Sequence, residues 1–186
     1  MKISQQFEVA GDPDTVWEFF QDVPAVAQCL PGAELKDVED DGSYNGQLSV
    51  KLGPMTAAFE GQAVVNPDPA TKTATIEGKG VDKRGGSRGQ VKLKYAIVPA
   101  GTGSTVDIDA DITLSGPAAQ FGRTGLINEI SKRLITDFVE CLEAKLGAGS
   151  DEAAGEIRAE EVKGISLFFA SLWGWFKGLF RRGSKG

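Results

Sequence analysis

Three aspartates at alternate positions, Asp107, Asp109 and Asp111, are the most regular set of potentially reactive side chains in this sequence. A carboxylate serves as a general acid or base when an apolar setting raises its pKa toward neutrality. Here the intervening residues are apolar, so the aspartates fall on the water-facing side of a predicted strand. The sequence contains no histidine, which removes the usual general base and the commonest zinc and haem ligand. We therefore expect a protein that is not an enzyme and binds no metal.

The two cysteines, Cys29 and Cys141, lie far apart in the sequence, each in an apolar helical context. Two cysteines cannot make a four-cysteine metal site. The chain begins without an apolar leader segment, which indicates a cytosolic protein. Since thiols stay reduced in that compartment, we predict buried free thiols rather than a disulfide.

A glycine-rich stretch, Gly78–Gly89, could be mistaken for a phosphate-binding loop. It lacks the Lys-Ser/Thr pair at P-loop spacing and the helix that should follow. We predict a hairpin whose basic tip, Lys83, Arg84 and Arg88, either binds a partner or is simply solvated. The net charge of −6 argues against nucleic acid as that partner.

Alternating apolar residues indicate strands over 2–9 and through most of 44–114. Asp12 followed by Pro13 is typical of a helix start, and a second short helix should follow Asp22 and end at Pro31. After Pro117 the apolar spacing changes to the helical period, predicting one helix of roughly 25 residues that ends near Gly147.

The alternation predicts an antiparallel sheet with one wet and one dry face, and the dry face needs a cover. The long helix carries the matching apolar stripe: Phe121, Ile127, Ile130, Leu134, Phe138 and Cys141. The order of strand, two short helices, six-strand meander and long helix predicts an α+β helix-grip fold. We assign residues 1–146 to this domain, 147–163 to a flexible acidic linker, and 164–186 to a hydrophobic tail.

The tail is the least soluble part of the sequence. Its apolar stretch, 165–180, would span roughly 24 Å as a helix, less than the hydrocarbon thickness of about 30 Å. We predict an amphipathic segment that lies in the membrane interface; the alternative is a helix that packs on this domain or on a partner. The residues predicted to bind the membrane are Phe168, Phe169, Leu172, Trp173, Trp175, Phe176, Lys177, Leu179, Phe180, Arg181 and Arg182.

Several segments of residues 1–146 together resemble the CoxG family of carbon monoxide dehydrogenase subunits. That family belongs to the polyketide cyclase/START-like (SRPBCC) superfamily, which includes Bet v 1-like proteins. The segments are FEVAGDPDTVWEFFQD, CLPGAE, KLGPMTAAFEGQA, GKGVDKRGGSRGQ and LSGPAAQFGR. The resemblance implies an accessory protein of a molybdenum-containing carbon monoxide dehydrogenase or a related hydroxylase, attached to the cytoplasmic face of the cell membrane as a peripheral protein. It supplies no catalytic residues.

A dehydrogenase in solution must pass electrons to a quinone in the bilayer. We therefore expect a quinone, menaquinone or ubiquinone, in an apolar cavity of this protein, with no covalent cofactor. The alternative is a recruitment adaptor with a filled core and no ligand; a small cyclase or hydrolase fits poorly without histidine. The candidate ligand-binding residues are Leu48, Val50, Met55, Phe59, Ile76, Leu93, Tyr95, Ile108, Phe121, Ile127, Ile130 and Leu134.

Overall fold

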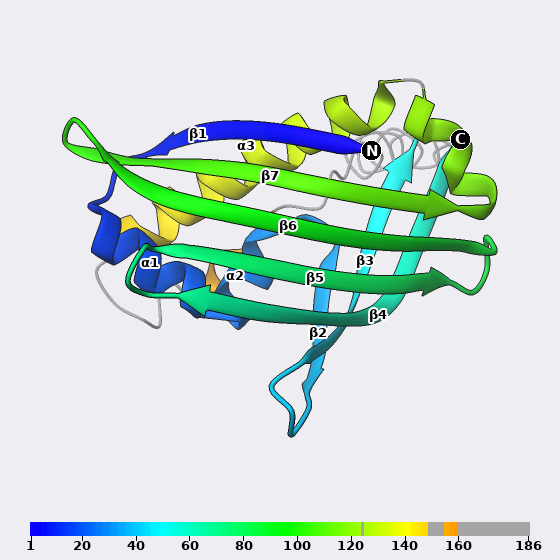
Figure 1. Cartoon of the computed structure of the whole chain (residues 1–186), viewed down its shortest axis with the longest axis horizontal. Coiled ribbons are helices and arrows are strands. Elements are labelled where there is room, and N and C mark those ends of the chain that lie inside the picture. The colour runs from blue at the N-terminus through cyan, green and yellow to red at the C-terminus, as the bar shows by residue number, and fades with distance from the viewer. Residues whose placement is uncertain (124, 149–154, 160–186) are drawn as a thin grey trace, which may run out of the picture.

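The computed structural model describes residues 1–123, 125–148 and 155–159 of the chain. One antiparallel sheet dominates it, with the helices gathered on one face (Figure 1). The elements in chain order are β1 (Lys2–Val9), α1 (Pro13–Gln21), α2 (Val23–Cys29), β2 (Ala33–Val38), β3 (Tyr44–Leu52), β4 (Met55–Asp68), β5 (Thr73–Asp82), β6 (Ser87–Ala100), β7 (Gly103–Ser115), the 3₁₀ helix η1 (Gly116–Arg123) and α3 (Leu126–Gly147).

The sheet has seven strands in the order β1-β7-β6-β5-β4-β3-β2. Strands β2 to β7 form the predicted six-strand meander, and β1 closes it by pairing with β7, with Phe7 opposite Val106. The axes of the antiparallel strands β1, β7, β6 and β5 are nearly aligned in Figure 1. Strand β4 bends, and β3 and β2 cross the other strands steeply. This curvature makes a concave face that the helices cover, and the expected helix-grip fold is confirmed.

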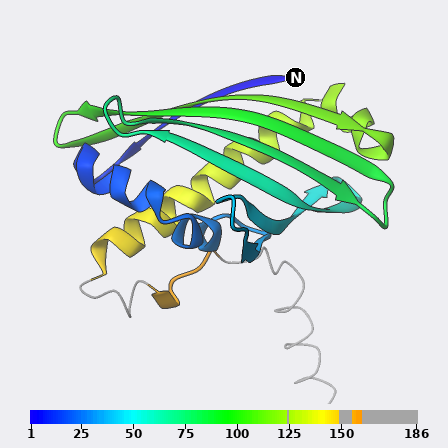
Figure 2. The same ribbon diagram turned by 60° about the horizontal axis from the view of Figure 1, so that its bottom comes forward.

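Helix α3 runs along the concave face beneath the sheet (Figure 2). It begins at Leu126, later than the single long helix predicted from the apolar spacing. Gly116–Arg123 forms a 3₁₀ helix instead, so Phe121 belongs to η1 and not to α3. Gly125 lies between the two with φ of 73°, a left-handed conformation that glycine adopts without strain. The break comes from this turn, which the apolar periodicity alone does not show.

The two short helices begin at aspartates, as predicted. The Asp12 carboxylate accepts hydrogen bonds from the backbone N–H groups of Asp14 (3.0 Å) and Thr15 (3.1 Å). Its other oxygen accepts from the Thr15 hydroxyl at 2.6 Å. These bonds lower the pKa of Asp12, the Thr15 hydroxyl contributing most. Asp22 caps α2 in the same way, accepting from the Ala25 N–H at 3.0 Å.

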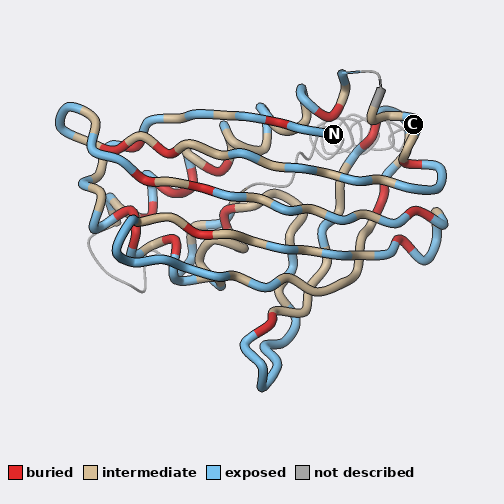
Figure 3. Tube along the Cα trace, in the orientation of Figure 1, coloured by how far each residue is buried: buried red, intermediate tan, exposed pale blue. Residues whose placement is uncertain are grey.

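Large aromatic side chains fill the concave face at the α1 end of the sheet. The Phe138 ring of α3 meets Phe20 edge-on at 5.7 Å between centroids, and Phe20 lies 4.9 Å from Tyr95 of β6. We call this cluster the aromatic core. Its buried members are Val9, Val16, Trp17, Phe20, Cys29, Ala74, Tyr95, Ile97, Val106, Phe138, Cys141 and Leu142. In Figure 3 the buried segments concentrate at this end of the sheet, with a few more near η1.

Cys29 and Cys141 form a disulfide in the structure, so the prediction of free thiols is wrong for this chain. The bond joins the end of α2 to α3, whose Cα atoms at these positions lie 5.4 Å apart. The residues are separated by 112 positions. Their proximity follows from packing of α2 against α3, which no local sequence pattern encodes.

Residues 155–159, which belong to the predicted linker 147–163, pack on the domain. The Ala159 N–H donates to the Gln28 carbonyl at 3.0 Å, and Ile157 contacts the aromatic core. Residues 149–154 and the predicted membrane-binding tail, 164–186, lie outside the described residues. In the part of the chain that is described, no helix is long and apolar enough to cross a membrane.

Candidate functional site: an apolar cavity over a row of glycines

A cavity of about 400 Å³ lies between the curved sheet and the helices, away from the aromatic core. Strands β2 to β7 form its floor and walls, and residues of α2 and α3 cover it. Leu48 on its wall is 37% exposed, which shows that the cavity opens to solvent on the β3 side. Its volume is within the range of about 300–1,000 Å³ typical of small-molecule sites.

Glycines replace side chains along the floor of this cavity. Gly46, Gly61, Gly80 and Gly89 are paired in one continuous row across β3, β4, β5 and β6. All four line the cavity, as does Gly78 in the next row. We call Gly46, Gly61, Gly80 and Gly89 the glycine row. Because a glycine projects nothing from the sheet, the floor is bare backbone where other rows carry apolar side chains.

The glycines differ in how firmly the backbone requires them. A Cβ at Gly61 would lie 1.8 Å from the Lys79 carbonyl oxygen, too close for any side chain. Gly61 thus allows β4 and β5 to approach closely at this point. At Gly89, by contrast, a Cβ would meet Phe59 and Leu114 at 3.5 Å, an ordinary contact. The backbone therefore does not require a glycine at position 89, although none of the floor there is covered by a side chain.

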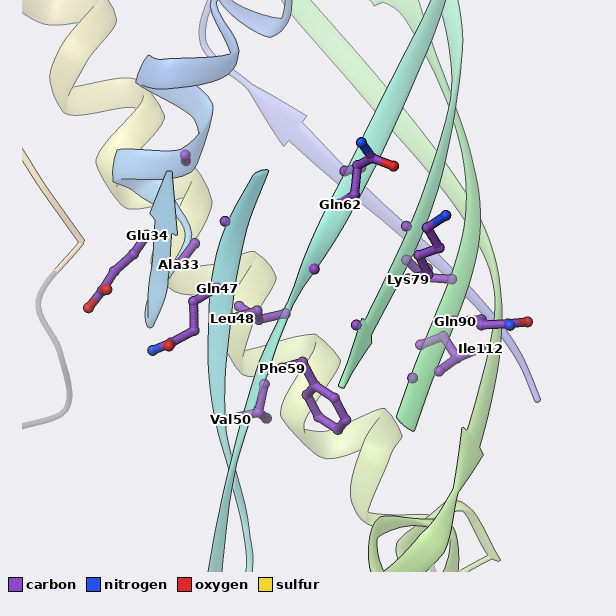
Figure 4. A pocket seen from close by; sticks show the side chains of 18 of the residues that line it. Ala33, Glu34, Gln47, Leu48, Val50, Phe59, Gln62, Lys79, Gln90 and Ile112 are labelled. Carbon is purple, nitrogen blue, oxygen red and sulfur yellow. The ribbon is translucent and has the colours of Figure 1, made fainter. Parts of the chain in front are cut away.

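Apolar side chains stand on both sides of the glycine row. Leu48 and Phe59 are direct cross-strand partners on β3 and β4, and with Val50 they form one wall (Figure 4). In that view Gln47 and Leu48 point to opposite sides of β3, as strand alternation requires. The opposite wall is Val91, Ile112 and Leu114 from β6 and β7. The cover consists of Val23, Ala27, Ile127, Ile130, Ser131 and Leu134.

Six of the twelve predicted ligand-binding residues line this cavity: Leu48, Val50, Phe59, Ile127, Ile130 and Leu134. The other six lie elsewhere on the dry face. Ile76, Leu93, Tyr95 and Ile108 belong to or pack against the aromatic core, and Met55 and Phe121 pack in a small cluster around Leu52 and Ala57. Strand parity identified the dry face correctly but could not show which part of it is hollow.

The residues missed by sequence reasoning are chiefly the glycines. They occupy inward-facing positions in the alternation of successive strands. This pattern is visible in the sequence at Gly46, Gly61, Gly78, Gly80 and Gly89. Glycine in a strand interior signals a bend or a close approach by another group. Val91, Ile112 and Leu114 were recognised as dry-face residues but were not chosen as ligand contacts.

The cavity presents little polar chemistry. The Ser131 hydroxyl donates to the Ile127 carbonyl of its own helix at 2.8 Å. The charged residues at its edge are Glu34 and Lys79, and the Lys79 side chain is exposed. Among the described residues, no group of three or more His, Cys, Asp or Glu could hold a metal. Tyr95, whose pKa is raised by burial, accepts a hydrogen bond from the Gln21 amide at 3.3 Å and lies in the aromatic core. The site therefore suits an apolar ligand.

The fold is shared with solved structures of low sequence identity. A conserved protein from Geobacillus kaustophilus is 17% identical, with 75% of this chain and 91% of that one covered at a TM-score of 0.65. The ZhuI aromatase/cyclase from a Streptomyces species is 15% identical, with coverage of 81% and 98% and a TM-score of 0.57. The protein Ms6760 from Mycobacterium smegmatis is 12% identical, with coverage of 80% and 92% and a TM-score of 0.55. These likenesses support the START-like fold.

A comparison with curated protein sequences gives no match. The family model for CoxG, the carbon monoxide dehydrogenase G subunit, in contrast, matches residues 6–147. The match spans the sheet from within β1, the glycine row and the whole of α3. The chain belongs to the CoxG family of carbon monoxide dehydrogenase subunits, which is a family of accessory subunits with a START-like fold.

Proposed function

We propose that this protein binds a respiratory quinone, such as menaquinone or ubiquinone, in the cavity over the glycine row and so links carbon monoxide dehydrogenase to the membrane. The observation that carries the proposal is the bare floor. A quinone head is a flat ring system, and a floor of backbone between two apolar walls accommodates a flat ring better than a bulky one. The redox chemistry would be the quinone's own, with the protein supplying burial and orientation.

The cavity walls support a lipophilic ligand. Leu48, Phe59 and Ile112 offer apolar contact, and apolar surface that a ligand removes from water there stabilises the complex by about 25 cal/mol per Å². The cavity opens to solvent beside Leu48, so the isoprenoid chain of a quinone can extend outward while the ring lies inside. No covalent attachment is required.

The membrane part of the proposal rests on the amino-acid composition of residues 164–186. Aromatic residues favour headgroup depth, and the basic residues there would face anionic lipid on the cytoplasmic side. A peripheral position would let the protein take quinone from the bilayer and return quinol after reduction. The dehydrogenase partner follows from membership of the CoxG family.

The test is quinone binding by the full-length protein, purified gently from its own host and extracted for lipids, and then titrated with menaquinone in detergent. We expect about one quinone per chain in the extract and saturable binding in the titration. The variant Ile130→Trp should weaken binding at least about tenfold, because its ring would occupy the cavity. Val64→Trp on the exposed outer face of β4 is the matched control and should bind as the unaltered protein does. If the unaltered protein neither carries nor binds a quinone, the proposal is wrong.

A pure recruitment adaptor, with no ligand, is the second candidate. It is favoured by the separate membrane and dehydrogenase roles that the sequence suggests, since these need no cavity. It predicts that Ile130→Trp leaves quinone-dependent carbon monoxide oxidation in membranes unchanged, whereas a quinone carrier predicts its loss. The same variant therefore decides between the two candidates.

A further inference from the structure

The outer, convex face of the glycine row carries a second hollow, of about 670 Å³. Gly46, Gly61, Gly80 and Gly89 line it as well as the inner cavity, because no side chain thickens the sheet on either face there. The side chains around the hollow are those of Lys36, Asn45, Glu60, Gln62, Lys79, Val81, Lys83, Arg88 and Gln90. We call this feature the outer hollow. Most of its side chains are polar or charged, unlike those of the inner cavity.

The charge around the outer hollow is strongly unbalanced. Lys36, Lys79, Lys83 and Arg88 surround a single carboxylate, Glu60, in a chain whose net charge is −6. Lys83 pairs with Glu60 at 2.7 Å and Lys36 lies 3.8 Å from it. The hydrogen bond from Lys83, together with the positive field of Lys36, lowers the pKa of Glu60. One carboxylate is thus shared by two lysines.

The remaining two cations of the outer hollow have no acidic partner within the described part of the chain. Lys79 and Arg88 are both exposed and neither takes part in an ion pair there. Lys79 lies opposite Gln90, and Arg88 opposite Val81, so the two cations are diagonal neighbours on β5 and β6. Such diagonal neighbours are about 7–8 Å apart, close enough for successive acidic groups of one ligand.

Other basic residues of the convex face are balanced. Further along β6, Lys92 pairs with Glu77 at 2.7 Å, and Lys92 and Lys94 lie opposite Asp111 and Asp109 of β7. The excess of positive charge is therefore local to the outer hollow. Positive surface of this kind attracts and orients a negatively charged partner.

We infer that the outer hollow is a docking site for an acidic segment of a partner protein. A hollow fits a protruding chain better than a flat bilayer, and the exposed amide of Gln90 at its edge can bond a peptide backbone. Four cations on an acidic protein are too few for a long polyanion such as nucleic acid. The inference rests on the proposed function only in taking the dehydrogenase as the partner to test.

The experiment measures binding of purified carbon monoxide dehydrogenase holoenzyme to the full-length protein by interferometry, over a range of salt concentrations. The double variant Lys79→Glu, Arg88→Glu should weaken binding at least about tenfold and reduce its dependence on salt. The control is Lys92→Glu, Lys94→Glu on the same face, which should change binding less than about twofold. Equal loss in both variants, or in neither, would overturn the inference.

Two further measurements separate the outcomes. If the unaltered protein does not bind the holoenzyme, a ten-residue peptide of alternating Asp and Gly serves as the probe; failure to bind it also overturns the inference. If Lys79→Glu, Arg88→Glu instead releases the protein from anionic vesicles while leaving holoenzyme binding intact, the hollow meets lipid headgroups and the inference is wrong. The single variant Arg88→Glu, at a residue that does not line the inner cavity, should weaken docking and leave menaquinone titration unchanged. Loss of docking without loss of quinone therefore tests this inference apart from the proposed function.

Discussion

The two ends of the concave face share one sheet and one long helix but are filled in opposite ways. At the α1 end, Phe20, Tyr95 and Phe138 meet in the aromatic core. At the other end, glycines occupy the corresponding inward positions of β3 to β6, and a cavity of about 400 Å³ remains. The alternation of inward and outward residues is the same at both ends. Whether a helix-grip sheet makes a core or a cavity thus depends on the size of the inward side chains, row by row.

The largest effect should come from deleting one aromatic ring at each end. Phe138 is 6% exposed and in edge contact with three other rings. We expect Phe138→Ala to lower the free energy of unfolding by about 3–5 kcal/mol, because it leaves a void in a packed region. Phe59→Ala removes the same ring from a wall that already faces a hollow, so its cost should be at least about 1 kcal/mol smaller. Denaturant unfolding of both variants measures this, and equal costs would mean that the two ends are packed alike.

The disulfide gives the next largest effect. It ties α2, which covers the cavity, to the part of α3 that lies in the aromatic core. Reduction, or the double variant Cys29→Ser, Cys141→Ser, should lower the free energy of unfolding by about 2–4 kcal/mol. Alkylation of the denatured protein, followed by mass measurement, first checks the bond itself. Two alkylated thiols without prior reduction would restore the free-thiol prediction.

Substitution along the glycine row should have graded effects. Gly61→Ala places a Cβ on the Lys79 carbonyl, and we expect a loss of about 1–3 kcal/mol. Gly89→Ala makes ordinary contacts and should change stability by less than about 1 kcal/mol, while weakening ligand binding because the methyl group rises from the floor. Thermal unfolding and quinone titration measure the two effects. Similar stability losses at both positions would show that the row serves only to bend the sheet.

The smallest effect is a pH dependence at the α1 end. The folded pKa of Asp12 is lowered below 3.8 by its hydrogen bonds to Thr15 and Asp14, so its stabilising contribution is present above the unfolded pKa. That contribution is lost as the pH falls through the folded pKa. The stability difference between the unaltered protein and Asp12→Ala should therefore shrink below pH of about 4. Urea unfolding at a series of pH values measures it, and a constant difference would show that the charge of Asp12 is irrelevant.

Much of the fold was predictable because it depends on local patterns. Asp12 and Pro13 predict a helix start because the first caps the helix and the second suits its first position. The alternation of apolar and polar residues through β3 to β7 predicts which residues face inward. The disulfide, the docking of Ala159 on Gln28 and the break before Leu126 were not predictable in this way. The first two depend on contacts between distant segments, and the break depends on a single turn.

The candidate site was half predictable for a related reason. Apolar side chains such as Leu48, Phe59 and Ile130 indicate a face that is shielded from water, and they were predicted from the sequence as ligand contacts. The same reasoning chose Tyr95, which lies in the aromatic core. The hydrophobicity of a residue predicts that its side chain is shielded from water, but it does not predict whether neighbouring side chains fill the space around it. The absence of side chains at Gly80 and Gly89 is the complementary signal, and it has to be read across strands whose pairing is known.

The hydrogen bond between Ala159 and Gln28 fixes the point from which the C-terminal part of the chain leaves the domain. Gln28 follows Ala27, a cover residue of the cavity, so the chain is pinned beside the cavity before the hydrophobic sequence begins at Gly164. Five further residues, fully extended, reach at most about 18 Å. Gly164 itself can therefore be no farther than about 18 Å from Ala159. A ligand that passes between the cavity and a surface bound near Gly164 would then travel a short distance and would not have to diffuse through bulk solution.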